Sequence, residues 1–556
     1  MKYKSANHRR EKLIKIKSIS GNIVDVLNNE IYAGTIEVKN GKIFKITQKD
    51  EKFSNFILPG FIDSHIHIES SMLIPSEFAR TAVLSGTVAV VCDPHEIANV
   101  VGVEGVNYMI KNSNQVPFKF YFGAPSCVPA TGFETSGAYI GPEEIEKLLK
   151  RDEIKYLGEM MDFPGVISSN KEVLEKINIA KKYGKPIDGH APGLSGKNLE
   201  KYINAGISTD HEAYTKEEGL EKIKLGMKIL IREGSAAKDF DALHTLIEEY
   251  SDYCMFSSDD RHPNDLVEGH INLLVKKAIS IGYDKMKVLK CACVNPVRHY
   301  NLDVGLLQTG DKADFIEIDN FDDLNIIRTV IKGFLAANKG WSLIPKVKTK
   351  FINNFHIRHK NAQDFAVEYK GKNINVIEAT DGQLITKKIV LEPKVEDNKI
   401  VSDAQRDIIK ISVVNRYKNA VPAVGFVKNF GIKKGAIASS VAHDSHNIIA
   451  VGVTDEDIAR AINLVIKYKG GLCVINEYGE NILPLPVAGL MTNKGAFRVA
   501  QDYKKLEAQA RKLGTKLIDP FMTLSFMALL VIPDLKLSDK GLFDGKKFGF
   551  ISLNEE

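Results

Sequence analysis

Two histidines separated by one residue end a short apolar run near the start of the chain. His65 and His67 follow the segment PGFID at residues 59–63. Alternate side chains of a strand point to the same face, so the two imidazoles would lie about 7 Å apart along it. Both rings could then reach one metal ion. The same spacing also occurs by chance, so the metal-binding hypothesis depends on the rest of the chain.

Four further apolar runs end in a residue that can bind a metal. The last residues of these runs are Glu159, His190, His211 and Asp259. In a barrel of parallel strands the carboxyl ends of the strands meet at one rim, where active sites lie. Each residue alone has an ordinary explanation, such as a loop hydrogen bond, an ion pair or a helix cap. Their common position at run ends instead predicts four histidines and two carboxylates in one cup.

The mixture of imidazole and carboxylate suggests which ions the cup would hold. Such ligands suit zinc, manganese or iron, and a carboxylate that can bridge suggests two ions. A hydroxide between the ions would then be the nucleophile. Asp259 would lie close enough to take its proton and pass it to the leaving group, with the neighbouring Asp260 as the competing candidate.

The elements that must position these residues follow from the hydrophobic pattern. Eight apolar runs with polar ends cover residues 57–67, 87–95, 118–125, 156–159, 186–190, 207–211, 228–232 and 253–259. Helix-like segments such as 172–183 and 240–250 separate them, and eight βα units occupy about 250 residues in a (β/α)8 barrel. The sequence therefore predicts an α/β protein with a TIM-like barrel over residues 57–302. A doubly wound nucleotide-binding fold is not favoured, because neither GxGxxG nor GxxxxGK[ST] occurs.

Two further regions flank the predicted barrel. Residues 1–56 and 303–346 carry short alternating runs, which predict one small β-sandwich domain built from two chain segments. Residues 347–556 begin with polar, alternating strands and continue with helix-like segments at 455–469 and 496–513. This region is expected to form an additional C-terminal α+β domain.

Composition excludes several functional classes. The 556 residues have a net charge of only +5, so a nucleic-acid partner is not required. The longest apolar stretch, residues 521–532, is shorter than the ~20 residues that cross a bilayer, which predicts no membrane span. Six cysteines are too few for a disulfide framework, and we expect a reducing, cytoplasmic setting. The basic segment Lys2 to Lys17 lacks a following apolar region and is interpreted as a solvated tail rather than a secretory signal.

Several longer motifs resemble a known family. The run PGFIDSHIH at residues 59–67 resembles the first-strand signature of the amidohydrolase superfamily. Six stretches resemble the adenine deaminase family in particular: HIHIESSM at 65–72, CDPHEIANV at 92–100, GEMM at 158–161, GHAPG at 189–193, SSDDRHP at 257–263 and VAHDSHN at 441–447. The resemblance thus extends into the C-terminal region, which many amidohydrolases lack.

The resemblance implies both a reaction and a ligand set. It implies hydrolytic deamination of adenine to hypoxanthine and ammonia in purine salvage, with two divalent ions per chain, Mn²⁺ or Fe²⁺, with Zn²⁺ also possible. One ion would be held by His65, His67 and Asp259, and the other by His190 and His211. Glu159 would bridge them in the place where many relatives carry a carbamylated lysine. A homodimer or other homo-oligomer is expected.

Other polar residues are candidates for binding the purine. Protonation of the ring could come from His95, Glu96 or Glu212, and Glu96 is preferred because a carboxyl at the second run end can address a purine edge. Its ordinary alternative is a charge at the start of a helix. Arg232 could contact the substrate or form a salt bridge at the rim. His443 and His446 could bind metal if helical, contribute polar contacts from a lid over the barrel mouth, or belong to a hydrogen-bonded loop.

Three other functions agree less well with these residues. A cytidine-deaminase-type fold is excluded, because the HxE and PCxxC signature of zinc deaminases is absent. A cyclic amide hydrolase of the dihydroorotase or hydantoinase kind would change the bond that is broken, and a non-catalytic barrel scaffold would have lost ligands. Glu159 and the C-terminal region argue against the cyclic amide hydrolase. The complete ligand set argues against the scaffold.

Overall fold

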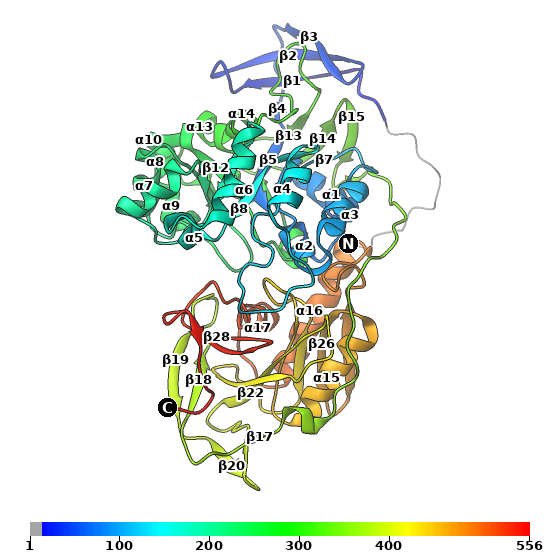
Figure 1. Cartoon of the computed structure of the whole chain (residues 1–556). Helices are drawn as coiled ribbons and strands as arrows, with labels where there is room; N and C mark the ends of the chain where they lie inside the picture. The colour runs from blue at the N-terminus through cyan, green and yellow to red at the C-terminus, as the bar shows by residue number, and fades with distance from the viewer. Residues whose placement is uncertain (1–13, 556) are drawn as a thin grey trace.

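The computed structural model describes residues 14–555, and these form three parts stacked along one direction (Figure 1). A small β-sheet lies at one end, a barrel with outer helices lies in the middle, and a mixed domain built from the C-terminal third lies at the other end. Most of the basic segment Lys2 to Lys17 lies outside the described residues.

The central part is a (β/α)8 barrel. Its parallel strands are β5 (Phe61–Ile66), β6 (Thr87–Cys92), β7 (Lys119–Ala124), β8 (Ile154–Met160), β9 (Ile187–Gly189), β10 (Thr209–Asp210), β11 (Lys228–Arg232) and β12 (Cys254–Ser257). Hydrogen bonds join β5 through β9 and β10 through β12. The backbone amide of Ser208 donates to Ile187 (2.9 Å) beside β9, and that of Asp259 donates to His65 (2.9 Å) across the closing seam. All eight predicted run ends therefore correspond to barrel strands.

Helices cover the outside of the barrel. They are α1 (Pro75–Ala82), α2 (His95–Val101), α3 (Val103–Ser113), α4 (Pro142–Leu149), α5 (Phe163–Ile167), α6 (Lys171–Lys182), α7 (Gly196–Asn204), α8 (Lys216–Lys224), α9 (Phe240–Leu243), α10 (Leu246–Tyr250), α11 (Pro263–Leu266), α12 (Ile271–Ser280), α13 (Lys285–Leu289) and α14 (Asn295–Tyr300). The predicted helix over 172–183 corresponds to α6, whose N-cap Asn170 accepts hydrogen bonds from two backbone amides. The prediction of a single helix over 240–250 is wrong, because a turn at residues 244–245 divides this segment into α9 and α10.

The small sheet joins two distant chain segments. Its order is β16 (Trp341–Ser342), β15 (Phe334–Asn338), β14 (Ile326–Ile331), β13 (Phe315–Ile318), β4 (Phe56–Pro59), β1 (Ser18–Asp25), β2 (Glu30–Lys39) and β3 (Lys42–Gln48). Strand β4 joins the segments, since it pairs with β1 on one side and with β13 on the other. Between β2 and β3, Asn40 and Gly41 both have positive φ angles (53° and 76°), as a tight hairpin turn requires.

The C-terminal part contains a second large sheet. Its order is β19 (Lys387–Leu391), β18 (Ile374–Glu378), β23 (Ala423–Lys428), β22 (Ile408–Val414), β25 (Ile448–Gly452), β24 (Ala436–Ser439), β26 (Gly471–Asn476) and β27 (Gly479–Pro484). Shorter strands are β17 (Val367–Glu368), β20 (Lys394–Glu396), β21 (Lys399–Val401), β28 (Leu535–Ser538), β29 (Gly541–Asp544) and β30 (Gly549–Phe550). The helices are α15 (Asp455–Tyr468), α16 (Ala496–Lys512) and α17 (Pro520–Phe526), and α16 contacts α1 and α11 of the barrel.

The barrel and the C-terminal part share one hydrophobic core. Buried residues from barrel strands and from α16, α17 and β24 belong to a single contiguous cluster, whereas α15 packs on the opposite face of the C-terminal sheet with a cluster of its own. The mouth of the barrel is therefore covered by a fixed neighbour. Within residues 14–555, the helices are all too short or too polar to cross a membrane.

Candidate metal centre and active-site cavity

The first group of potential ligands lies where β12 meets β5. Asp259 has a left-handed backbone (φ 53°), a conformation that costs an Asp residue about 1 kcal/mol and turns its side chain toward β5. Its Oδ1 lies 3.0 Å from His67 Nε2 and 3.6 Å from His65 Nε2. The two Nε2 atoms lie 3.3 Å apart. Three ligand atoms thus point at one small volume.

Hydrogen bonding beyond this group orients His67. The Nδ1 of His67 donates to the backbone carbonyl of Asp93 (3.0 Å). This bond fixes the tautomer and leaves the lone pair on Nε2 free for a cation, as in most metal-bound histidines. The Asp93 side chain also accepts from the Glu159 amide (2.9 Å), and it lies so close to Gly158 that a Cβ there would come within 2.3 Å of it.

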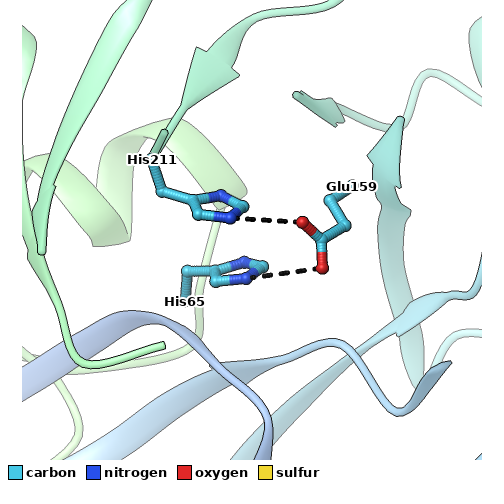
Figure 2. Close-up of side chains that lie close together, drawn as sticks. All are labelled: His65, Glu159 and His211. Carbon is cyan, nitrogen blue, oxygen red and sulfur yellow. Dashed lines mark ion pairs between the residues drawn. The ribbon is translucent and has the colours of Figure 1, made fainter. Parts of the chain in front are cut away.

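Glu159 stands between two groups of histidines. Its Oε1 faces His67 Nε2 (3.2 Å) and His65 Nε2 (3.9 Å). Its Oε2 faces His190 Nδ1 (2.9 Å) and His211 Nε2 (3.2 Å). Figure 2 shows the carboxylate directed edge-on at the stacked rings of His65 and His211, whose centroids are 4.0 Å apart. One carboxylate therefore serves two ligand groups, one with each oxygen.

The carboxylates of this centre are ionised. Burial alone would raise the pKa of Glu159, but the charge of His211 and the hydrogen bond from His190 hold it well below its usual range. Burial would likewise raise the pKa of Asp259, and Arg232 lowers it well below its usual range. Two buried anions beside four imidazoles form a site that divalent cations fit.

A buried nitrogen without a hydrogen-bond partner also indicates that these residues suit a metal ion. Among the described residues, His211 Nε2 is buried without a hydrogen-bond partner, although its Nε2 points at a carboxylate. The groups His65–His67–Asp259 and His65–Glu159–His211 each bring their ligand atoms within 4.8 Å of one another. Nitrogen and carboxylate oxygen in this arrangement are the ligand types that zinc, manganese and iron accept.

Arg232 contacts the centre through Asp259, and its side chain is fully buried. Its Nη1 donates to Asp259 Oδ2 (2.7 Å), its Nε donates to Asp239 (2.9 Å), and its Nη2 donates to Glu212 Oε2 (2.9 Å). The guanidinium thus donates to three carboxylates and fixes the free oxygen of Asp259. Burial would raise the pKa of Glu212, but Arg232 lowers it.

His95 and Asp260 also face the centre. His95 begins α2, and its Nδ1 lies 3.3 Å from Glu159 Oε1. Asp260 follows Asp259 and accepts a hydrogen bond from Ser70 (2.5 Å). Both residues line the same cavity as the proposed ligands.

Glu96 pairs with the second histidine motif across the boundary between the barrel and the C-terminal part. Its Oε1 contacts His443 Nδ1 (2.5 Å), and its Oε2 contacts His446 Nε2. His443 lies in a turn at residues 443–445 and His446 directly follows it, so neither histidine lies on a helix. This turn reaches over the barrel mouth, so His443 and Asp444 line the cavity.

The C-terminal part supplies the apolar side of the cavity. Phe526 ends α17 and stacks on the ring of His443 with centroids 5.3 Å apart. Four further apolar side chains from the same region line the cavity, and together with Phe526 they form what we call the apolar roof: Leu384, Leu529, Val531 and Ile532. The cavity therefore has a polar floor of histidines and carboxylates beneath an apolar roof, a combination that suits a flat, partly polar ring.

The sequence predicted many of the residues around this cavity but not all of them. All six proposed ligands and all seven other candidates lie around one cavity or pair with a residue that lines it. Asp93, Asp239, Asp444 and the apolar roof were not singled out. Asp93 and Asp444 lie within the motifs at 92–100 and 441–447, beside predicted site residues, whereas no local pattern marks Asp239 or the apolar roof.

Comparisons with known proteins agree with this geometry. The amidohydrolase family model matches residues 56–336, and the model of the adenine deaminase C-terminal domain matches residues 383–549. A protein named adenine deaminase from Sulfurovum sp. (strain NBC37-1) is 55% identical over 96% of this chain and 99% of its own length. Proteins of the same name from Methanosarcina mazei and Salinibacter ruber are 51% and 52% identical, and each match covers at least 96% of this chain and 98% of the relative.

Proposed function

Because the chain belongs to the adenine deaminase family of amidohydrolases, we propose that it hydrolyses adenine to hypoxanthine and ammonia in purine salvage. The single observation that carries this proposal is the position of Glu159 between two histidine groups. Such a site is suited to a pair of divalent ions. The reaction needs this help, because the aromatic ring resists attack at C6 and ammonia leaves poorly.

We propose that two ions, manganese or iron with zinc as a further option, bind around Glu159. One would lie among His65, His67 and Asp259, and the other beside His190 and His211. The ions, when bound, lower the pKa of water and supply a hydroxide nucleophile at neutral pH. The ionised carboxylates and the unpartnered His211 nitrogen support this assignment.

The residues of the chain would then position the purine and move protons. Asp259 would take the proton of the attacking oxygen through Oδ1 and pass it to the departing amine, while Arg232 holds Oδ2. The apolar roof would cover the ring faces and exclude water. Glu96 and the residues around it would supply the proton that the ring nitrogen requires. Asp260, His95 and Glu212 remain candidates for contacts with the substrate.

Two further proposals concern the setting of the enzyme. We propose a cytoplasmic location, supported by six buried cysteines that all carry free thiols. We also propose a homodimer or other homo-oligomer, which sedimentation of the purified protein can test.

A direct assay distinguishes the proposed reaction from its main competitor. Protein loaded with Mn(II) is expected to consume adenine, followed by its ultraviolet absorbance, and to release one ammonia for each adenine lost. Protein that leaves adenine intact but opens dihydroorotate or hydantoin would contradict the deaminase assignment. Protein that turns over none of these compounds while fully loaded would favour a binding role.

A further inference from the structure

We propose that His443 is the proton donor to the purine ring, and that Glu96 acts through His443 rather than on the ring. This inference rests on the function proposed above. It replaces a carboxyl donor on the barrel by an imidazole donor that the C-terminal part contributes. His443 would thus be a catalytic residue, whereas Glu96 and His446 would be positioning residues.

The first observation is that Glu96 has no oxygen left for a substrate. Its side chain is buried, with 2% exposed. Oε1 is occupied by His443 Nδ1 at 2.5 Å and Oε2 by His446 Nε2. Burial would raise the pKa of Glu96, but the two histidines hold it well below its usual range. An ionised carboxylate with both oxygens occupied accepts protons and does not donate them.

The second observation fixes the tautomer of His446. Its Nδ1 accepts a hydrogen bond from the backbone amide of Ala442 (3.2 Å). A nitrogen that accepts carries no proton, so the proton of the neutral ring must lie on Nε2, which donates to Glu96. Burial lowers the pKa of His446 to about 4 and keeps the ring neutral. His446 is therefore an anchor for Glu96, and its Nε2 has no lone pair available for a metal.

The third observation concerns the free nitrogen of His443. Among the described residues, the only hydrogen-bond partner of this ring is Glu96, which contacts Nδ1. The Nε2 atom is left without a partner, on a side chain that lines the cavity and is held flat by Phe526. A carboxylate that orients one imidazole nitrogen while the other faces the substrate is the usual arrangement of a histidine acid or base.

The charges around His443 favour its protonated form. Burial lowers its pKa, but Glu96 on α2, Asp260 beyond β12 and Asp444 in the same turn raise it to about 9. The other groups near this triad are His446, which is neutral, and His95, whose Nε2 lies 3.7 Å from Glu96. Burial and the charge of His67 lower the pKa of His95, but Asp93 and Glu96 raise it well above its usual range. At neutral pH the ring of His443 is therefore an imidazolium, with one proton directed to Glu96 and the other available at Nε2.

The proposed step balances in protons and bonds. When hydroxide forms the new C–O bond at C6, the C6–N1 double bond becomes single, and N1 takes the proton from His443 Nε2. Asp259 then moves the hydroxyl proton to the amino group, the C6–N bond breaks, and ammonia leaves. The product keeps the N1 proton and gains the C6 carbonyl. The proton that water loses when it becomes hydroxide restores the protonated form of His443.

The test compares variants that separate holding Glu96 from donating a proton. In His443→Asn the amide nitrogen can take the place of Nδ1 and hold Glu96, but Nε2 is lost. We expect kcat for adenine to fall about 100- to 1000-fold, with metal content and KM within twofold of wild type. Wild-type activity should decline above about pH 9, and this alkaline limb should be absent in the variant. The surface variant His359→Asn is the matched control and should behave as wild type.

A second measurement does not depend on activity. In the zinc-loaded protein with ¹⁵N-labelled histidine, NMR titration should reveal a ring of His443 that titrates near pH 9. That signal should be absent in His443→Asn. In Glu96→Gln it should move at least one unit lower, because the carboxylate that raises the pKa is gone. If His443→Asn does not fold, His443→Gln serves in its place, since it also removes the titrating ring.

The possible failures point to different conclusions. A wild-type protein that does not deaminate adenine would overturn the proposed function itself. A wild-type protein that deaminates adenine while His443→Asn keeps its kcat within threefold would overturn only this inference. A loss of activity in Glu96→Gln with no change in the His443 titration would do the same, since it would place the donor on Glu96.

Discussion

At the residue scale, the centre depends on one carboxylate that has two sets of partners. Burying Glu159 would be costly if it stood alone, but each of its oxygens faces imidazole nitrogens within 4 Å. Arg232 likewise provides buried hydrogen-bond donors for Asp239, Glu212 and Asp259. Each of these buried carboxylates therefore has a hydrogen-bonding or charged partner within 4 Å.

The substitution Glu159→Gln tests the bridging role. An amide carries no charge and offers only one acceptor oxygen, so it cannot bind a cation on both sides. We expect bound metal, measured by inductively coupled plasma mass spectrometry, to fall below one ion per chain, and activity to fall at least 100-fold. The exposed residue Glu143 provides a matched control as Glu143→Gln, which should retain full metal content. Two ions per chain with normal turnover in Glu159→Gln would show that another group joins the ions.

At the element scale, strand ends position the proposed ligands and α17 covers the cavity. The ends of β5, β8, β9, β10 and β12 carry the six proposed ligands, because parallel strands of a barrel end at one rim. The last residue of α17, Phe526, lies over this rim and stacks on His443. The strands thus define the polar floor, and a helix from another part of the chain defines the roof.

Removal of the Phe526 ring should weaken substrate binding without affecting the metal. In Phe526→Ala the purine loses an apolar contact and His443 loses its stacking partner. We expect KM for adenine to rise about tenfold, which corresponds to about 1.4 kcal/mol, with unchanged metal content. Steady-state kinetics and metal analysis of the same preparation measure both quantities. An unchanged KM would mean that the ring does not contact the substrate.

Helix α16 offers a test of stability against pH. Burial and the nearby Asp519 raise the pKa of Glu507 from the ordinary 4.5 to about 7. An acid whose pKa is raised by folding stabilises the native state below its unfolded pKa, and this contribution is lost as the pH rises toward 7. The melting temperature of Glu507→Gln, relative to wild type, should therefore increase between about pH 5 and pH 8. A difference that does not change with pH would show that Glu507 titrates normally.

At the scale of the whole molecule, local signals predicted the barrel and the residues gathered at its rim, but not the contacts between distant segments. The eight strands were recognisable because each apolar run ends in polar residues, and this pattern also marked His65, Glu159 and Asp259. The pairing of Glu96 with His443 joins residues 347 positions apart, and no periodicity in either segment indicates it. The division of the helix at 244–245 was also missed, since its hydrophobic pattern continues through the turn.

The shared core explains why these distant contacts persist. Barrel strands and C-terminal helices contribute to one hydrophobic cluster, so the turn that carries His443 cannot move independently of α2 without exposing apolar surface. A site assembled from two parts of the chain is thereby kept in one geometry. The C-terminal part is expected to be required for activity for this reason, and not only for stability.

A metal titration of the whole protein tests the two-ion centre directly. Mn(II) is added in steps to metal-free protein, and ammonia release from adenine is measured at each step. If Glu159 joins two ions in one active centre, activity should rise until two equivalents per chain are bound and then remain constant. A plateau at one equivalent, or full activity without metal, would contradict the two-ion centre on which the proposed deamination depends.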